Sequence, residues 1–210
     1  DHVLVDQLRA KGAIIFAKAV NTEYNGRAGD PGGRHTPDKV LPSTLGYQRS
    51  TWAGNPSNPY DTSRSASLGS SSGSALSVSA NLVMASLGEE TRASTRGPSN
   101  HNAVALILPH KAMLGFDGGA IGADIYCDRS GIHARRLGDC AKILDALKDS
   151  ENGYYDPRDV YTTVPRSSVL DTTYASHVAT GATENALKGM RIGVVRESMV
   201  YPEGSKTEEP

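Results

Sequence analysis

The sequence contains few cysteines, few aromatic residues and no long apolar run. Only Cys127 and Cys140 occur in 210 residues, and their spacing matches no zinc-binding pattern. We expect both to be free thiols, which favours a reducing compartment such as the cytoplasm without establishing the compartment. No stretch reaches the 18 or so consecutive apolar residues of a membrane-spanning helix, so no membrane is evident as a partner.

The chain also lacks an excess of charge of either sign. Its formal net charge is −1, whereas nucleic-acid-binding domains carry a clear basic excess, so we expect no nucleic-acid partner. There is no His-Glu-x-x-His motif and no group of carboxylates and histidines at ligand spacing. The sequence therefore predicts no metal site.

The apolar segments that are present alternate between helical and strand-like patterns, which is typical of an α/β fold. We expect one α/β domain over residues 1–210, with a mixed β-sheet covered by helices. The predicted helices are 1–11, 75–87, 137–147 and 182–188, the predicted strands are 13–17, 103–108 and 190–195, and the predicted loops are 22–67 and 150–176.

The most informative stretch runs from Gly69 to Pro98. Residues 69–75 read Gly-Ser-Ser-Ser-Gly-Ser-Ala, an apolar run of helical length follows, and Gly88 is a typical helix stop. Residues 88–98 then form a second loop, which contains Ser94. A serine hydrolase needs such an arrangement, because the nucleophile and the group that handles its proton must come from two fixed positions.

These motifs resemble the signature region of the amidase signature family, in which Leu-Gly-Glu-Glu-Thr-x-x-Ser-x-Arg-x-Pro follows the serine-rich turn. That family uses a Ser–cis-Ser–Lys triad. The resemblance implies that Ser94 is the nucleophile and Ser70 the bridging serine, and their separation of 94 − 70 = 24 residues matches the family's spacing. It also implies that the backbone N–H groups of Thr91, Arg92, Ala93 and Ser94 form an oxyanion hole.

The same resemblance implies a function and a set of partners. The substrate would be a small-molecule amide, hydrolysed through a serine acyl-enzyme without a metal or organic cofactor. The family's lysine base lies tens of residues before the signature and has no counterpart in this sequence, so we expect the chain to be an incomplete portion of the fold. Lys18 corresponds instead to a non-catalytic lysine. A homodimer is one option for the oligomeric state.

Two departures leave a second function open. Arg92 and Ala93 stand where the family has Gly-Gly or an acidic residue and glycine, and Ile132 replaces a proline. If the position of Ala93 needed a positive φ, alanine would cost about 1–2 kcal/mol there relative to glycine. Together with the missing lysine, these departures are compatible with a non-catalytic, amidase-like binding or scaffold protein.

The serine-rich turn has other interpretations. Residues 69–73 satisfy G-x-S-x-G, the nucleophile elbow of α/β-hydrolase esterases, with Ser71 as nucleophile. That motif requires a strand directly before it, and we expect none in the polar residues 61–67. A flexible Gly/Ser tract without chemistry is the third alternative.

Four polar residues near Ser94 are interpreted as structural. His101 and His110 flank a predicted strand, where histidines are usually hydrogen-bonded structural residues. Glu90 and Arg96 are expected to form an ion pair that braces the loop of Ser94.

Overall fold

The computed structural model describes residues 1–22, 56–65, 69–119, 126–148, 172–181, 183 and 185–196. Most of the loops predicted at 22–67 and 150–176 lie outside these residues. Within them, a hairpin at 57–65 lies in the first predicted loop, and helix α5 (Tyr174–Gly181) begins in the last three residues of the second.

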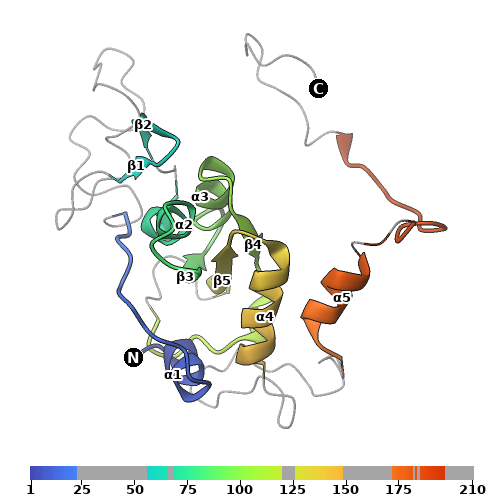
Figure 1. Cartoon of the computed structure of the whole chain (residues 1–210), viewed down its shortest axis with the longest axis horizontal. Coiled ribbons are helices and arrows are strands. Elements are labelled where there is room, and N and C mark those ends of the chain that lie inside the picture. Colours follow the sequence, from blue (N-terminus) through green and yellow to red (C-terminus); the bar gives the residue numbers. More distant parts are fainter. Residues whose placement is uncertain are drawn as a thin grey trace.

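A three-stranded sheet lies at the centre of the described structure. Its strands are β3 (Ala85–Glu90), β4 (Ala105–Ile107) and β5 (Arg129–Ala134), in the order β3-β5-β4. Both pairs are antiparallel. Helices α2 (Ser72–Ser79) and α3 (Arg96–His101) contact the sheet on one side and α4 (Leu137–Leu147) on the other (Figure 1). The α/β layering predicted from the sequence is confirmed.

The side chains of β5 explain why both faces of the sheet are covered. Ile132 and Ala134 are fully buried and belong to the apolar core with α4. His133 alternates with them and faces α3, where its ring contacts Ser99. Since successive side chains of a strand point to opposite faces, β5 places one apolar row and one polar row back to back.

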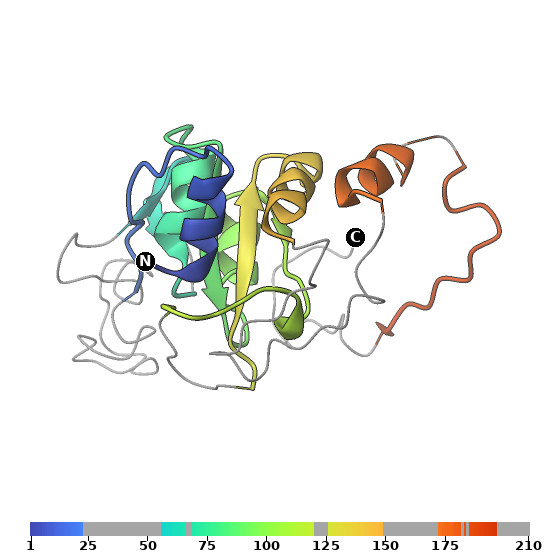
Figure 2. The ribbon, with the colours of Figure 1, turned by 90° about the horizontal axis from the view of Figure 1, so that it is seen from below.

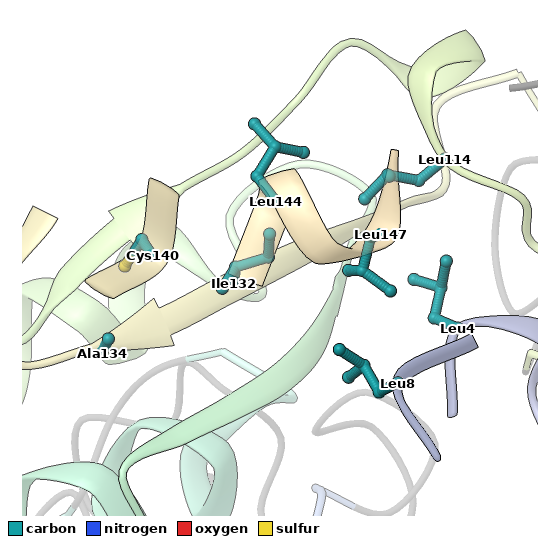
Figure 3. Packing of buried hydrophobic residues seen from close by; sticks show 8 residues of the cluster. All are labelled: Leu4, Leu8, Leu114, Ile132, Ala134, Cys140, Leu144 and Leu147. Atoms are coloured by element: carbon teal, nitrogen blue, oxygen red, sulfur yellow. The ribbon is translucent and has the colours of Figure 1, made fainter. Parts of the chain in front are cut away.

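The apolar core joins α1 (Val3–Ala10), α4 and β5 (Figure 3). Leu4 and Leu8 of α1 point toward Leu147 of α4, as the helical spacing predicted. Helix α1 begins at a cap in which the ring of His2 accepts the N–H of Leu4, and it ends before Gly12, whose φ is +85°. On its other side α4 contacts α5 (Figure 2), whose first N–H groups are accepted by Asp145.

The helix predicted at 75–87 is wrong in its second half. Helix α2 ends at Ser79, and Asn81 has a φ of +62°, a left-handed conformation that terminates helices. Residues 85–90 form β3 instead, with Leu87 opposite Ile132 and Gly88 opposite Gly131. The apolar run therefore holds a short helix, a turn and a strand, which helical spacing alone did not separate.

Three further predictions differ from the structure. Residues 13–17 and 190–195 are extended but outside any strand, and Ile14 and Ile192 are 92% and 66% exposed. Neither segment has a partner strand within the described residues, and apolar composition without a partner does not make a strand. The described part of 182–188 forms turns and no helix.

Two short strands precede the serine-rich turn. They are β1 (Ser57–Asn58) and β2 (Asp61–Ser65), which pair antiparallel, so the expectation of no strand in 61–67 was wrong for its first five residues. Asn58 stabilises the turn by accepting the N–H of Tyr60 at 2.8 Å, and its amide donates to the carbonyl of His101 at the end of α3. The hairpin is thereby tied to the helix that follows Ser94.

Three smaller features complete the described structure. Both cysteines are free thiols, Cys140 buried and Cys127 partly exposed. A short 3₁₀ helix, η3 (Lys111–Met113), connects β4 to the segment that leads toward β5. Among the helices in these residues, none is long and apolar enough to cross a membrane.

Candidate active site

The serine-rich turn lies directly against the loop that contains Ser94. The N–H of Ser71 donates to the carbonyl of Ser94 at 3.0 Å. On the other side of the turn, Thr22 donates its N–H to the Ser70 carbonyl at 2.9 Å, and Gly73 donates to the Val20 carbonyl at 3.0 Å. The two serine-bearing segments that were predicted to meet are therefore neighbours, and residues 20–22 run along the turn.

Gly69 allows this close approach. A Cβ atom at Gly69 would lie 2.8 Å from Cδ of Pro98, 3.0 Å from the carbonyl oxygen of Ala93 and 3.0 Å from Cα of Ser94. Real Cβ contacts are not that short, so any side chain at this position would push the two loops apart. The glycine before Ser70 thus sets the distance between the turn and the loop of Ser94.

The hydroxyls of Ser70 and Ser94 make no hydrogen bond within the described structure. Ser70 is 6% exposed and Ser94 is half-buried. Among the described residues, neither hydroxyl has a hydrogen-bond partner. No peptide bond in this part of the chain is cis, including the one between Gly69 and Ser70.

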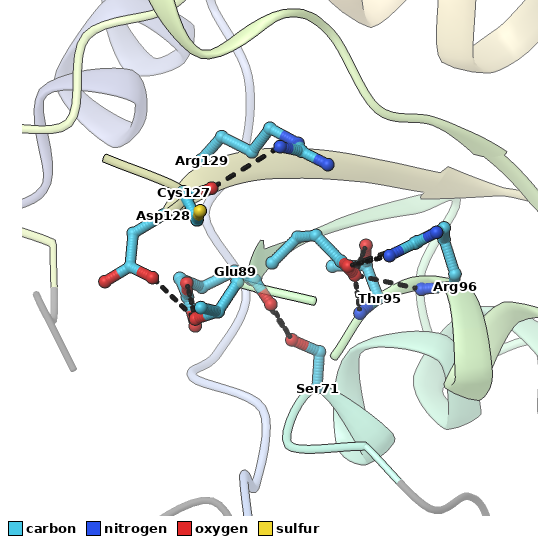
Figure 4. Close-up of polar contacts among 9 residues, drawn as sticks. Ser71, Glu89, Thr95, Arg96, Cys127, Asp128 and Arg129 are labelled. Atoms are coloured by element: carbon cyan, nitrogen blue, oxygen red, sulfur yellow. Dashed lines mark hydrogen bonds and ion pairs between the residues drawn. The ribbon is translucent and has the colours of Figure 1, made fainter. Parts of the chain in front are cut away.

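Ser71, in contrast, is used structurally. Its hydroxyl donates to the carbonyl of Glu89 and accepts the N–H of the same residue, both at 3.1 Å (Figure 4). Ser74 donates to the carbonyl of Leu87 at 2.8 Å. These bonds fix the start of α2 on β3. Because the Ser71 hydroxyl is held by backbone groups as both donor and acceptor, it is poorly suited to be the nucleophile of an esterase elbow.

The loop from Thr91 to Ser94 presents unused backbone donors. Within the described residues, no hydrogen bond takes the N–H of Thr91, Arg92, Ala93 or Ser94. Ala93 has no positive φ, so the alanine that replaces the family's glycine introduces no left-handed strain. Arg92 and Ala93 are exposed. A row of free N–H groups beside a serine hydroxyl can donate hydrogen bonds to a developing oxyanion.

Glu90 braces the far end of this loop, where Thr95 and Arg96 lie (Figure 4). Its carboxylate is 0% exposed and accepts the N–H and hydroxyl of Thr95 at 2.7 and 2.8 Å, and the N–H of Arg96 at 3.3 Å. The Arg96 guanidinium donates to its other oxygen at 3.1 and 3.0 Å. Burial alone would raise the pKa of Glu90, but the bonds from Thr95 and Arg96 outweigh it and lower the pKa. The predicted brace is confirmed.

Glu89 and Asp128 lie at the near end of the loop (Figure 4). The hydroxyl of Thr91 is 2.5 Å from Oδ1 of Asp128 and 3.2 Å from Oε1 of Glu89. Burial, and then the charge of Asp128, raises the pKa of Glu89 to about 7. Sequence analysis missed this pair, because Asp128 is 37 residues from Thr91 and no motif joins them.

A buried histidine was also missed. His133 is 0% exposed, and its Nδ1 is 2.9 Å from the hydroxyl of Ser99. Its Nε2 has no partner among the described residues and lies beside Gly88, where a Cβ would come within 2.8 Å of Nε2 and 2.9 Å of the Ser71 hydroxyl. Burial lowers the pKa of His133 to about 4, so the ring is neutral at neutral pH. The predicted structural histidines, His101 and His110, are both exposed.

The described residues contain no group of three or more histidine, cysteine, aspartate or glutamate residues that could hold a metal ion. Lys18 precedes the segment 20–22 that runs along the serine turn, and Lys18 is exposed. The geometry is thus that of two serine loops, a row of free N–H groups and two carboxyl braces.

Comparison with known proteins decides the family. A model of the family described as Amidase matches residues 1–208. The chain belongs to the amidase family. A probable amidase of Arabidopsis thaliana is 33% identical over 195 residues, which cover 93% of this chain and 33% of the relative. A component of the glutamyl-tRNA(Gln) amidotransferase of Cupriavidus necator is 35% identical over 144 residues, 67% of this chain and 27% of that one.

Solved structures of the amidase family share the fold. The peptide amidase of Stenotrophomonas maltophilia is 27% identical with a TM-score of 0.58, over 85% of this chain and 32% of that chain. An amidase family protein of Bacillus anthracis has the same identity of 27% and TM-score of 0.58, over 77% of this chain and 28% of that chain. The chain thus spans about a third of the length of the curated amidase relatives that it matches.

Proposed function

We propose that this chain supplies the nucleophile, the bridging serine and the oxyanion hole of a serine amidohydrolase that acts on linear amides. The observation that carries the proposal is the contact between the two serine segments, in which the N–H of Ser71 donates to the carbonyl of Ser94 at 3.0 Å. It brings the turn of Ser70 against the loop of Ser94. Membership of the amidase family supports the same assignment.

In this mechanism Ser94 Oγ attacks the carbonyl carbon of the amide. Its proton passes to Ser70, and a proton passes from Ser70 to the nitrogen of the leaving amine. The C–N bond then breaks and leaves an acyl ester on Ser94, which water hydrolyses to the carboxylic acid and free Ser94. A serine hydroxyl is a weak nucleophile at neutral pH, so a base is needed. We assign that base to a lysine outside the 210 residues.

The loop before Ser94 stabilises the transition state. The N–H groups of Thr91, Arg92, Ala93 and Ser94 would donate to the oxyanion of the tetrahedral intermediate. Loss of one such donor typically costs about 3–4 kcal/mol of barrier. Because these N–H groups have no partner among the described residues, they need not break a bond to serve the reaction.

The similar proteins indicate a general substrate class. A peptide amidase and a component of an amidotransferase are among the similar proteins, so a small-molecule or peptide amide is the class that we propose. Arg92 adds an exposed cation to the loop of Ser94 and favours a substrate with a polar or anionic group nearby.

The proposal is tested by labelling the full-length protein with a fluorophosphonate probe, which reacts with activated serines. Wild type should label, Ser94→Ala should not, and Ser70→Ala should label far more slowly while its circular dichroism spectrum stays unchanged. Ser79→Ala is the matched control, because Ser79 ends α2 and, among the described residues, its hydroxyl donates only to the carbonyl of Leu76. Normal labelling of Ser94→Ala would refute the nucleophile assignment.

An amidase-like scaffold without catalysis is the second candidate. It is favoured by Arg92 and Ala93, which replace two family positions directly before the nucleophile. If no serine of the full-length protein labels, and no amide is hydrolysed, this candidate replaces the first.

A further inference from the structure

The loop that contains Ser94 is held at both ends by carboxyl groups from opposite faces of β3. Glu90 faces α3 and holds Thr95 and Arg96 after the loop. Glu89 is its neighbour in the strand, so its side chain points to the other face, where Thr91 begins the loop. The family assignment explains the first brace through the motif, but it says nothing of the second.

The second brace consists of two carboxyl groups and one hydroxyl. The Thr91 hydroxyl lies 2.5 Å from Asp128 and 3.2 Å from Glu89, so one hydroxyl contacts both carboxyl groups. Thr91 has one proton to donate, and the shorter distance assigns it to Asp128. Asp128 is 1% exposed. Glu89 is half-buried. Two carboxylates that contact the same hydroxyl, one of them buried, repel each other when both are ionised, so a proton between them stabilises the group.

We propose that Glu89 and Asp128 share one proton and, through Thr91, act as a positioning pair for the oxyanion-hole donors that precede Ser94. The proposal rests on the function proposed above for the Ser94 loop. With its proton, Glu89 donates to Asp128, and the ionised Asp128 accepts the Thr91 hydroxyl. This bond fixes Thr91, whose N–H is the first donor of the loop, while Glu90 fixes Thr95 and Arg96 at the other end of the loop from the opposite face of β3.

Release of the shared proton should loosen the near end of the loop. The charged groups around Glu89 are Asp128, which precedes β5, and Glu90 in β3, both of which raise the pKa of Glu89 after burial has done so. Lys111 of η3 donates to the backbone carbonyl of Asp128 at 3.1 Å, and Arg129 begins β5. As pH rises through about 7, Glu89 ionises beside Asp128. The repulsion weakens the contact that holds Thr91.

The experiment measures kcat of full-length wild type and Glu89→Gln on one amide between about pH 6 and about pH 8.5, which brackets the pKa of about 7. Glutamine keeps a donor toward Asp128 at every pH, so it imitates the protonated glutamate. The ratio of the two kcat values cancels each titration that the proteins share, including that of the base. We expect the ratio of Glu89→Gln to wild type to rise several-fold with an apparent pKa of about 7.

Asp6→Asn provides the matched control, because Asp6 is an exposed carboxylate on α1 paired with Arg9. Its ratio to wild type should stay flat over the same range. In an Asp128→Asn background, the kcat ratio with and without Glu89→Gln should no longer change with pH, because the asparagine amide carries no charge that repels the ionised Glu89. A flat ratio for Glu89→Gln would overturn the proposal.

A second measurement separates this proposal from the proposed function. If no activity is found, the function fails, and carbon-13 NMR of the labelled Glu89 carboxyl still tests the pair. Titration near pH 7 that moves lower in Asp128→Asn supports the shared proton. Titration near the ordinary value of 4.5 in both proteins overturns it.

Discussion

Replacement of Glu90, the last residue of β3, by glutamine should destabilise the protein and the loop of Ser94 that it braces. Glu90 is fully buried and accepts three bonds from Thr95 and the Arg96 backbone, plus two from the guanidinium. Arg96 is 58% exposed and can regain water, so its part of the loss is small. Each of the other three bonds loses roughly 1 kcal/mol when its acceptor becomes neutral, and the amide nitrogen cannot accept at all. The total is about 2–4 kcal/mol.

Urea unfolding of the full-length protein measures this loss, and fluorophosphonate labelling of Ser94 measures its effect on the site. Asp6→Asn is the control, because Asp6 is an exposed carboxylate paired with Arg9. Glu89→Gln, which makes the same chemical change one residue earlier, should have the opposite effect on the free energy of unfolding above about pH 7, because it removes a carboxylate whose folded-state pKa is raised. A loss below about 1 kcal/mol for Glu90→Gln would refute the idea that this carboxylate braces the loop.

The dependence of stability on pH distinguishes the brace from simple packing. The pKa of Glu90 is lowered in the folded protein, so its contribution to stability is present above the ordinary value of 4.5 and is lost as pH falls below it. Glu90→Gln should lack that component. Acid unfolding curves of the two proteins should therefore converge as pH falls.

Three further predictions concern other positions. Gly69→Ala should slow labelling of Ser94 strongly, because its Cβ would lie 2.8–3.0 Å from the facing loop, whereas Gly97→Ala, with nothing within 4 Å, should not. Ala103→Gly should raise the free energy of unfolding by up to about 1 kcal/mol, since Ala103 has a φ of +51°. His133 has a folded-state pKa of about 4 against 6.5, so stability should fall as pH drops through that window, and thermal melts of His133→Asn should show less of this loss.

Part of the fold could be predicted from local patterns. Helices α1 and α4 are amphipathic over at least two turns, and their buried residues Leu4, Leu8, Leu144 and Leu147 follow helical spacing. Strand β4 is a short apolar run between polar residues and lies where it was expected. In each case the physical signal is the burial of one face, which the sequence displays directly.

Pairing between distant segments could not be predicted in the same way. Strand β3 was interpreted as helix because Ala85 and Leu87 continue an apolar run, and only the register with β5 makes them a strand. Residues 13–17 are as apolar as a buried strand but have no partner among the described residues. Local composition indicates that a segment is buried, but it does not identify the strand or helix, distant in the sequence, that packs against it.

The same limitation separates the candidate residues that sequence spacing connected from those that it missed. Ser70, Ser94 and the Glu90–Arg96 brace belong to one motif, so sequence spacing was enough to connect them. Glu89 was placed in a loop after a predicted helix stop, and a loop assigns no faces to its residues. As a strand, β3 sends Glu89 and Glu90 to opposite sides. Only then does Asp128, two residues before Ser130 on the facing strand, become the neighbour of Glu89. The register of two strands, not a motif, therefore creates the pair that holds Thr91.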